Sequence, residues 1–300
     1  MSDMDMTRDM RIGWIGLGKM GAPIADNLLA AGYDLTVFDA DAARIRSQQA
    51  KGARGARSVA EVARNTDVIF SIIPDDAALR RIALGVGGVI ANARPETLYV
   101  DMSTVSPTIS EVVRDAALTR RLGFIAAPVS GSTVLAERRQ LTVFASGPAD
   151  CYQKVKPLFE AISSKQYYVG ADQQARYLKL AINHLVGSTA VMLGEALTLG
   201  RKGGVEWKLM LDVIGDSVVA SPLIKYKLDP LRERDFTAAF SVRQMLKDMT
   251  LVVEAGADAG VEMATAALVM NKFAEYANDG GADLDFFSIL QAIEARAKLV

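Results

Sequence analysis

The sequence predicts two domains: an α/β domain with a parallel sheet over residues 1–170, and an all-α domain over residues 171–300 that a long helix joins to it. In the first half, short β-branched runs alternate with helical stretches, which is typical of parallel α/β sheets. After Gly170 no convincing strand follows, and Leu, Ala and Val recur at helical spacing. The length of 300 residues also favours two domains.

The elements expected in the first domain follow from these runs. Strands are expected at residues 11–15, 35–38, 68–73, 98–101, 124–126, 141–145 and 166–169. Ser58 with Glu61 forms the pattern of a capping box, and Ser106 places Pro107 at a first helical position, so both mark helix starts. In the second domain, helices are expected at residues 173–203, 206–215, 242–259, 262–278 and 285–297.

Charge and scarce residue types exclude several function classes. The 34 basic and 35 acidic residues leave a net charge of −1, so a nucleic-acid partner is not expected. Cys151 is the single cysteine and His184 the single histidine, which argues against intrachain disulfides, thiolate zinc sites, iron–sulfur clusters and His-cluster metal sites. If the chain transfers hydride, its acid/base group must therefore be a lysine, a tyrosine, a carboxylate or His184.

No targeting or membrane segment is expected. The N-terminal segment MSDMDMTRDMR is too polar for a signal peptide, and no apolar run is expected to reach the length of about 20 residues that a membrane span needs. A cytoplasmic location without a membrane partner is therefore expected.

A glycine-rich turn indicates a dinucleotide site. Gly16, Gly18 and Gly21 have GxGxxG spacing after an expected strand, and an amphipathic helix begins near Lys19 and ends at Gly32. Such glycines allow a tight turn, close approach of a pyrophosphate and close helix–strand packing, while the helix N–H groups face the phosphates. This context predicts a Rossmann-type domain, whose cofactor turn comprises Gly16, Leu17, Gly18, Met20 and Gly21.

Asp39 bears on the choice of cofactor. It ends the second expected strand, eighteen residues past Gly21, where a carboxylate can accept hydrogen bonds from the adenosine ribose. A carboxylate there favours NAD and repels the 2′-phosphate of NADP. Arg44, on the next helix, could cover such a phosphate, so NADP stays open as an alternative.

Five separated segments resemble the β-hydroxyacid dehydrogenase family, close to its 3-hydroxyisobutyrate dehydrogenases. They are GLGKMGAPIADNL at 16–28, Ile73–Pro74, VDMSTVSP at 100–107, APVSGS at 127–132, and Lys179 with Asn183, followed by Phe240 and Lys247–Asp248. Ala126 and Ser132 depart from the family's DAPVSGG pattern, and Gln173, Ala175 and Ile182 depart from its lysine motif. The lysine and the second asparagine are kept, whereas the substrate side chain is not identified.

The resemblance implies a role for each of these positions. Ile73 and Pro74 would begin a cofactor-binding loop, and Thr104 would approach the nicotinamide. Ser130, Gly131 and Ser132 would bind the substrate carboxylate, and Lys179 and Asn183 would be catalytic. Phe240 would flank the nicotinamide, and Lys247 would reach the cofactor or the substrate.

The residues themselves are compatible with these roles. Lys179 and Asn183 are four apart, so they share one helix face. The flank of Lys179 is apolar, and partial burial would lower its pKa, so that the neutral amine could take a hydroxyl proton as hydride leaves. The turn at 130–132 offers hydroxyls and backbone N–H groups to an anion, although a plain connection is the alternative. For Lys247, the alternative is a solvated ion pair with Asp248.

The sequence therefore predicts an NAD(P)-dependent dehydrogenase that oxidises a small 3-hydroxy acid to its semialdehyde, or catalyses the reverse, with Lys179 as acid/base. Two alternatives stay open: an NADPH-dependent aldehyde or imine reductase on the same scaffold, and an NAD-binding protein without chemistry. The small residues Gly187, Ala190 and Gly194 would let another helix or a second subunit approach the long helix, and a homodimer or tetramer is expected.

Overall fold

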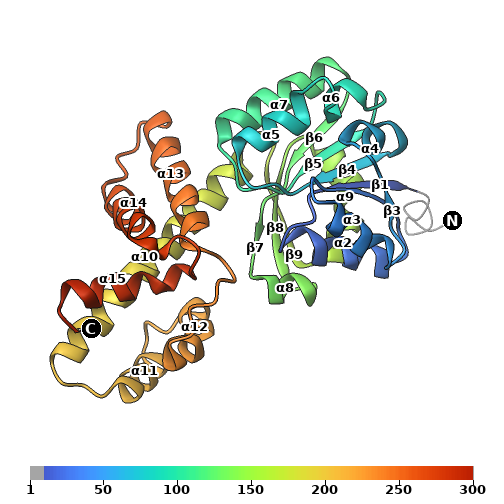
Figure 1. Ribbon diagram of the computed structural model, residues 1–300. Helices are drawn as coiled ribbons and strands as arrows, with labels where there is room; N and C mark the ends of the chain where they lie inside the picture. Colours follow the sequence, from blue (N-terminus) through green and yellow to red (C-terminus); the bar gives the residue numbers. More distant parts are fainter. Residues whose placement is uncertain (1–9, 300) are drawn as a thin grey trace. The chain divides into compact units, whose positions relative to one another are not determined.

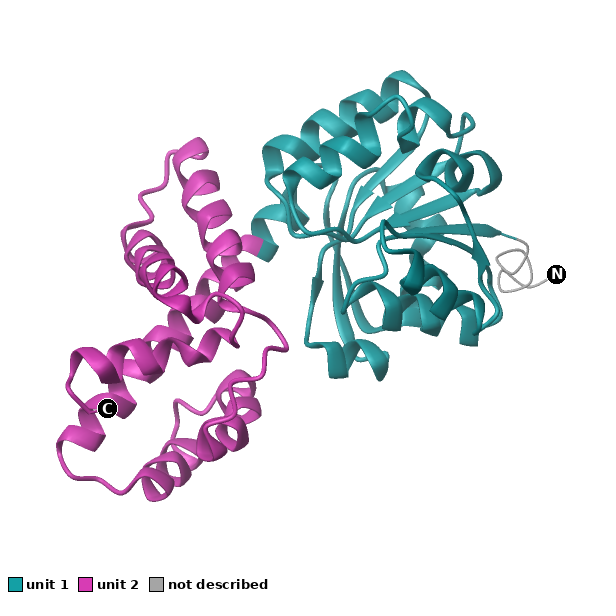
Figure 2. Cartoon of the chain, in the orientation of Figure 1, with its two compact units in different colours: residues 1–179 teal, residues 180–300 magenta. Residues whose placement is uncertain are grey.

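The computed structural model describes residues 10–299 and divides the chain into two compact units, Met1–Lys179 and Leu180–Val300 (Figure 2). Each unit is described by itself. Most of the polar N-terminal segment, residues 1–9, and residue 300 lie outside the described residues.

Unit 1 is built on one sheet of nine strands (Figure 1). They are β1 (Arg11–Ile15), β2 (Asp34–Phe38), β3 (Arg54–Gly55), β4 (Val68–Ser71), β5 (Leu98–Asp101), β6 (Gly123–Ala126), β7 (Val129–Ser130), β8 (Leu141–Ser146) and β9 (Ser163–Gly170). The order is β3-β2-β1-β4-β5-β6-β8-β7, with β9 beside β8. The strands from β3 to β6 pair in parallel, which confirms the Rossmann-type prediction, whereas β8 runs antiparallel to β6 and β7.

Helices cover both faces of this sheet (Figure 1). They are α2 (Gly21–Ala30), α3 (Ala42–Gln49), α4 (Val59–Asn65), α5 (Asp76–Leu84), α6 (Val89–Asn92), α7 (Pro107–Thr119), α8 (Thr133–Glu137) and α9 (Ala149–Ile162). Successive strand residues point to opposite faces, so Trp14 packs in a core with α2 and α9, and Ile15 packs in a second core with α4, α5 and α7.

The two expected helix starts are present. Ser58 Oγ accepts from the backbone N–H of Glu61 (3.1 Å), although the Glu61 carboxylate accepts from Arg57 N (2.8 Å), one residue before the cap. Ser106 Oγ accepts from Ile109 N (3.1 Å), and Pro107 is the first residue of α7. Both caps satisfy N–H groups that a helix start leaves unpaired.

The long helix α10 (Gln174–Lys202) continues into unit 2, whose described residues form helices joined by loops and contain no strand. Unit 2 contains α11 (Trp207–Asp216), α12 (Pro222–Glu233), α13 (Val242–Asp258), α14 (Ala264–Tyr276), the π-helical turn η1 (Ala277–Gly281), the 3₁₀ turn η2 (Phe286–Ser288) and α15 (Ile289–Arg296). The helix expected at 285–297 is therefore divided into η2 and α15, and α12 was not expected. Buried side chains of α10, α11, α13 and α14 form the core of this unit.

By length and composition, α10 is long and apolar enough to cross a membrane, although the sequence predicts no such segment. The helix has 29 residues, and its most apolar window has a mean hydropathy of 1.3. Half of that window is buried inside the protein, and Leu180, Ala190 and Leu197 belong to the core of unit 2. A core helix of a soluble protein passes the same test, so we interpret α10 as a core helix.

Candidate active site

The glycine-rich turn joins β1 to α2, which begins at Gly21 rather than near Lys19. Gly16 has a φ of +98°, in the left-handed region that favours glycine. A Cβ on Gly21 would lie 2.0 Å from the carbonyl oxygen of Gly16, far inside van der Waals contact. Gly16 and Gly21 therefore allow the turn and the close packing of α2 on the end of β1.

Gly18 differs from its two neighbours because the space beside it is open. The protein atom nearest to a Cβ on Gly18 would be Nη1 of Arg44, at 3.9 Å. The N-cap residue of α2, Met20, makes no side-chain capping bond to the helix. An uncapped helix start beside an open glycine fits the pyrophosphate of a dinucleotide.

Asp39 lies directly after β2 and is held beside this turn. One of its carboxylate oxygens accepts from Leu17 N (2.6 Å), and the other accepts from Asp41 N (2.8 Å). The guanidinium of Arg44 lies 3.6 Å from the oxygen that Leu17 also contacts. Leu17 thus uses its backbone to orient Asp39, while its side chain is buried in the core. The predicted acid and the predicted glycine turn are therefore brought together.

The loops after β4 and β5 are also joined. Ile73 N donates to Ser103 Oγ (2.9 Å), and Ser103 Oγ in turn donates to Asp101 Oδ1 (2.8 Å). Pro74 and the half-buried Thr104 are the next residues of these two loops. The segments predicted separately from Ile73–Pro74 and from VDMSTVSP therefore form one structure at the carboxyl ends of neighbouring parallel strands, where open α/β sheets bind their ligands.

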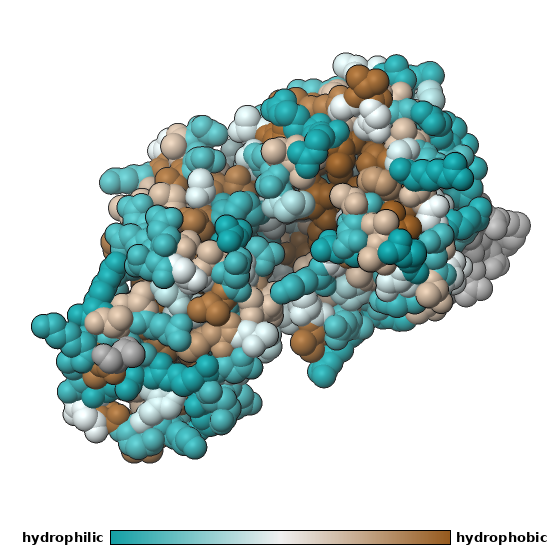
Figure 3. Space-filling model, in the orientation of Figure 1, coloured by the Kyte–Doolittle hydropathy of each residue, from teal (hydrophilic) through white to brown (hydrophobic). Residues whose placement is uncertain are grey.

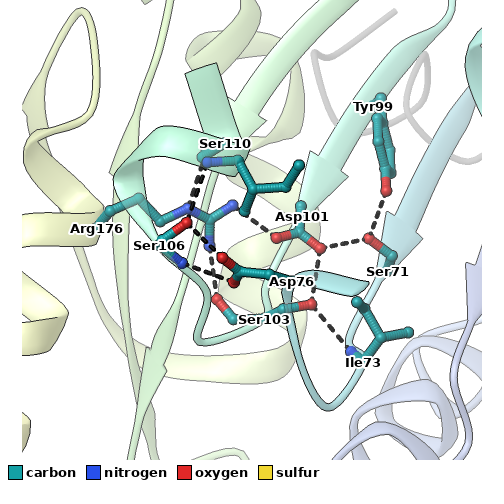
Figure 4. Close-up of polar contacts among 10 residues, drawn as sticks. Ser71, Ile73, Asp76, Tyr99, Asp101, Ser103, Ser106, Ser110 and Arg176 are labelled. Carbon is teal, nitrogen blue, oxygen red and sulfur yellow. Dashed lines mark hydrogen bonds and ion pairs between the residues drawn. The ribbon is translucent and has the colours of Figure 1, made fainter. Parts of the chain in front are cut away.

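A buried polar network lies beneath these loops (Figure 4). Asp101 is fully buried, and its carboxylate contacts Ser71, Ser103 and Arg176. Burial raises the pKa of the Tyr99 hydroxyl, and the negative charge of Asp101 raises it further, so Tyr99 stays protonated. Sequence reasoning did not single out Asp101 or Arg176, because neither stands in a recognisable pattern of charge pairing.

The turn at Ser130, Gly131 and Ser132 lies between β7 and α8. Gly131 has a φ of +137°, and a Cβ there would come within 2.6 Å of Leu141 Cδ2, so this turn requires glycine. Ser132 Oγ caps α8 by accepting from Leu135 N (3.4 Å). The hydroxyl of Ser132 is therefore held at the turn and keeps its proton for donation. Gly131 is exposed and both serines are partly exposed.

Lys179 and Asn183 lie one turn apart on α10. Lys179 is half-buried, and Asn183 is buried and donates from Nδ2 to Asp248 Oδ2 (2.6 Å). The apolar residues that flank Lys179 are not all buried, because Leu180 lies in the core whereas Tyr177 is exposed. The sequence prediction that the two polar residues share one helix face therefore agrees with the continuous helix.

Asp248 links two of the predicted site residues. It is buried, and its second oxygen lies 2.7 Å from Nζ of Lys247, so it stands between Asn183 on α10 and Lys247 on α13. The sequence indicated Asp248 only as the neighbour of Lys247. Phe240 is not part of this trio, since its ring packs edge-on against Phe286 with centroids 5.9 Å apart.

Metal-binding groups do not gather in the described part of the chain. Residues 10–299 contain no group of three or more His, Cys, Asp or Glu side chains arranged to hold a metal ion. Around the predicted site residues, the structure brings the carboxylates Asp39, Asp101 and Asp248 together with basic partners.

Two family models together match almost the whole described chain. The NAD binding domain of 6-phosphogluconate dehydrogenase matches residues 11–170, and the NAD-binding domain of NADP-dependent 3-hydroxyisobutyrate dehydrogenase matches residues 174–293. These matches indicate a nicotinamide dinucleotide as the cofactor and leave NAD and NADP unresolved.

Individual proteins are similar over nearly their full length. 2-(Hydroxymethyl)glutarate dehydrogenase of Eubacterium barkeri is 32% identical, with 89% of each chain covered. NAD-dependent L-serine dehydrogenase of Pseudomonas aeruginosa is also 32% identical, over 94% of this chain and 97% of that one. The structure of Mycobacterium tuberculosis 3-hydroxyisobutyrate dehydrogenase with L-serine has a TM-score of 0.85 at 28% identity, and covers 95% of this chain and 99% of that one. From its sheet order, its glycine turn and these matches, the chain belongs to the β-hydroxyacid dehydrogenase family.

Proposed function

We propose that this protein is a nicotinamide-dependent dehydrogenase that oxidises a small 3-hydroxy acid to the corresponding semialdehyde, or catalyses the reverse reaction, with Lys179 as acid/base. The observation that carries the proposal is the half-buried Lys179 one helical turn before Asn183, in a chain of this family. The names of the relatives refer to three substrates: 2-(hydroxymethyl)glutarate, L-serine and 3-hydroxyisobutyrate. In each of them, a CH₂OH group is bonded directly to the carbon that bears a carboxylate.

The chain's own residues would handle the carboxylate and the proton. When bound, the nicotinamide dinucleotide supplies the hydride acceptor. The neutral amine of Lys179 takes the proton of the substrate hydroxyl as hydride leaves the carbon that bears this hydroxyl. In the reverse direction, the ammonium returns the proton to the oxygen. The hydroxyls of Ser130 and Ser132, with the backbone at Gly131, hold the substrate carboxylate. Asp248 fixes the amide of Asn183, so that Asn183 can orient the lysine or the substrate.

The direct test is the absorbance of reduced nicotinamide with purified protein, NAD or NADP, and a panel of 3-hydroxy acids that includes hydroxyisobutyrate, serine, glycerate and threonate. Turnover of one or more acids is the expected result. Cofactor binding without turnover in either direction would favour a non-catalytic NAD-binding protein. Turnover only with NADPH and an aldehyde or imine would favour the reductase alternative.

We further propose that NAD is preferred over NADP. Asp39 is held beside the turn by two backbone N–H groups, so its carboxylate would face the adenosine ribose. Replacement Asp39→Ser is expected to shift the ratio of kcat/KM values toward NADP by about tenfold or more, because it removes the charge that repels the 2′-phosphate. Steady-state kinetics with both cofactors measures this ratio.

The control for this prediction is Arg44→Ala. Arg44 is half-exposed and lies 3.6 Å from Asp39, so its removal should weaken any use of NADP without creating a preference for it. A ratio that stays the same in Asp39→Ser would show that Asp39 does not select the cofactor.

We also propose that the protein assembles as a homodimer or tetramer, through an apolar stripe on α10 made of Leu185, Met192 and Leu199. These side chains are 66%, 59% and 75% exposed, and their spacing of seven residues places them on one side of the helix. Apolar patches also interrupt the hydrophilic surface in Figure 3. Exposed apolar stripes of this kind are typical of surfaces that another subunit covers.

The small residues of α10 serve a different contact. A Cβ on Gly187 would meet Met249 of α13 at 2.8 Å, and a Cβ on Gly194 would meet Ile293 of α15 at 2.9 Å. The sequence left open whether another helix of the same chain or a second subunit packs against these small residues. At both glycines the neighbour is a helix of the same chain. The subunit interface is therefore proposed on the stripe and not at the glycines.

Replacement Met192→Glu is expected to lower the assembled mass, because it would place a charge within the apolar interface. Size-exclusion chromatography with light scattering across the micromolar range measures the mass. Leu118→Glu, at an exposed position of α7 in unit 1, is the matched control and should leave the mass unchanged. A wild-type protein that is monomeric throughout this range would rule the assembly out.

A further inference from the structure

We propose that Arg176, through its buried ion pair with Asp101, is a positioning residue that holds the first turn of α10, and with it Lys179, against the carboxyl ends of β4 and β5. This inference rests on the proposed function, since it gives the position of Lys179 a role in proton transfer. All the residues that carry it belong to unit 1.

Arg176 lies in the first turn of α10, and its side chain is held at three points. The side chain is 1% exposed. Its Nη2 donates to Asp101 Oδ2 (2.6 Å), its Nη1 to the carbonyl oxygen of Ser103 (2.6 Å), and its Nε to Ser110 Oγ (3.1 Å) (Figure 4). The acceptors come from β5, the loop after it and α7. Since a guanidinium is planar and its donors point in fixed directions, three such contacts fix the orientation of the side chain.

Asp101 extends this anchor to the loop after β4. Its second oxygen, Oδ1, accepts from Ser71 Oγ (2.6 Å) and from Ser103 Oγ (2.8 Å). Because the Ser71 hydroxyl donates its one hydrogen bond to Asp101, the Tyr99 hydroxyl must be the donor in the 2.9 Å contact with Ser71. Ser103 Oγ also accepts from Ile73 N (2.9 Å), and Ile73 opens the predicted cofactor loop. One carboxylate is thus bonded to the arginine and, through Ser103, to the cofactor loop.

A second contact fixes the start of α10 on the sheet. Ala175 N donates to Ser146 Oγ at the end of β8 (3.2 Å). Lys179 lies three residues beyond Arg176, within one helical turn of the anchor. A continuous helix transmits the position of its first turn to the next residues, so the anchor defines where the base of the Lys179 side chain stands relative to the loop at Ile73.

Stability alone does not account for such a pair. Two charges removed from water lose much of their hydration, and apolar residues of similar size often serve stability as well or better. What an apolar pair lacks is direction, because only directed hydrogen bonds place the helix start at one angle to the strands. A misplacement of about 1 Å at a reacting group can lower a rate by about 100-fold.

The test is a double-mutant cycle between this pair and the lysine. The variant Asp101→Asn/Arg176→Met removes both charges, so that neither is left buried without its partner. In the Lys179 background it should lower kcat by about 10- to 100-fold. In the Lys179→Ala background, measured at high enzyme concentration, the same change should lower kcat by less than about threefold, because no lysine remains to be positioned. Arg176→Lys, which cannot reach all three acceptors, should be intermediate.

Arg234→Met is the matched control. It breaks an arginine–carboxylate pair with the buried Glu294 in unit 2, and neither residue belongs to the anchor or to the proposed site. It should lower Tm without lowering kcat. Equal losses of kcat in both lysine backgrounds, or an unchanged kcat in Asp101→Asn/Arg176→Met, would overturn the positioning role.

Failure of the proposed function gives a different result. It would appear as a wild-type protein without turnover, or as Lys179→Ala with full turnover. The anchor is then measured without substrate, by amide hydrogen exchange over residues 177–182. Faster exchange in Asp101→Asn/Arg176→Met than in wild type would support the anchor, and unchanged exchange would contradict it.

Discussion

Replacement of Lys179 by alanine is expected to lower kcat by about 1,000-fold and to leave the Kd for NAD unchanged. The expected loss is large because the proposed mechanism routes the hydroxyl proton through this amine. The chain offers few substitutes, since His184 is its single histidine. The cofactor should still bind, because its predicted turn and Asp39 lie in a different part of the chain.

This prediction is measured by steady-state turnover on the best acid of the panel, with NAD binding followed by quenching of tryptophan fluorescence. Lys202→Ala is the matched control, since Lys202 is an exposed lysine at the other end of the same helix. It should keep the wild-type kcat. Turnover of Lys179→Ala within a few-fold of wild type, with NAD bound, would assign the proton to another group.

Replacement of Gly18 by alanine is expected to raise the Kd for NAD by about 100-fold, which corresponds to about 2.7 kcal/mol of binding free energy. The added methyl group would occupy the open space beside the uncapped start of α2, where the pyrophosphate is expected. The stability of the free protein should change little, because the nearest atom of another side chain would be 3.9 Å from the added methyl group. Its free energy of unfolding should therefore stay within about 0.5 kcal/mol of wild type.

Gly21→Ala provides the contrast. There the methyl group would lie 2.0 Å from the carbonyl oxygen of Gly16, so the fold itself should lose stability. Calorimetric titration with NAD and thermal unfolding of both variants separate the two effects. Wild-type affinity for NAD in Gly18→Ala would show that the cofactor does not approach this turn.

Local hydrophobic patterning accounts for much of the predicted fold. The strands β1 and β5 begin and end where alternation and β-branched runs placed them, and α10 differs from its expected range by one residue at each end. Each of these elements places a buried face in a core, so its pattern appears in consecutive residues. The two strands that were missed, β3 and β7, have only two residues each and show no alternation.

Longer-range features could not be predicted in this way. The reversal of β8 relative to β6 depends on pairing with a distant strand, and strand direction leaves no local signal. The helix α12 was missed although Ser221 and Pro222 mark its start. Its pattern is disguised because the buried position 227 is a lysine, which pairs with Asp285 at 2.8 Å, and because Pro230 lies near its end.

The same limit applies to the site. The glycine turn and Asp39 form a contiguous motif, which sequence spacing reveals. The contact of Arg176 with Asp101 spans 75 residues, and that of Asn183 with Asp248 spans 65. Neither pair has a spacing rule, and each depends on how strands and helices are folded together.

The division between the two units falls immediately after Lys179, inside a continuous helix. Lys179, the proposed acid/base, therefore belongs to the same unit as the cofactor turn, whereas Asn183 and Lys247 belong to the second unit. Recombination at this point would exchange one set of proposed site residues and leave the other set unchanged. A chimera that joins residues 1–179 to the helical unit of a relative would keep the cofactor turn and Lys179 of this chain and take the residues at positions 183 and 247 from the relative.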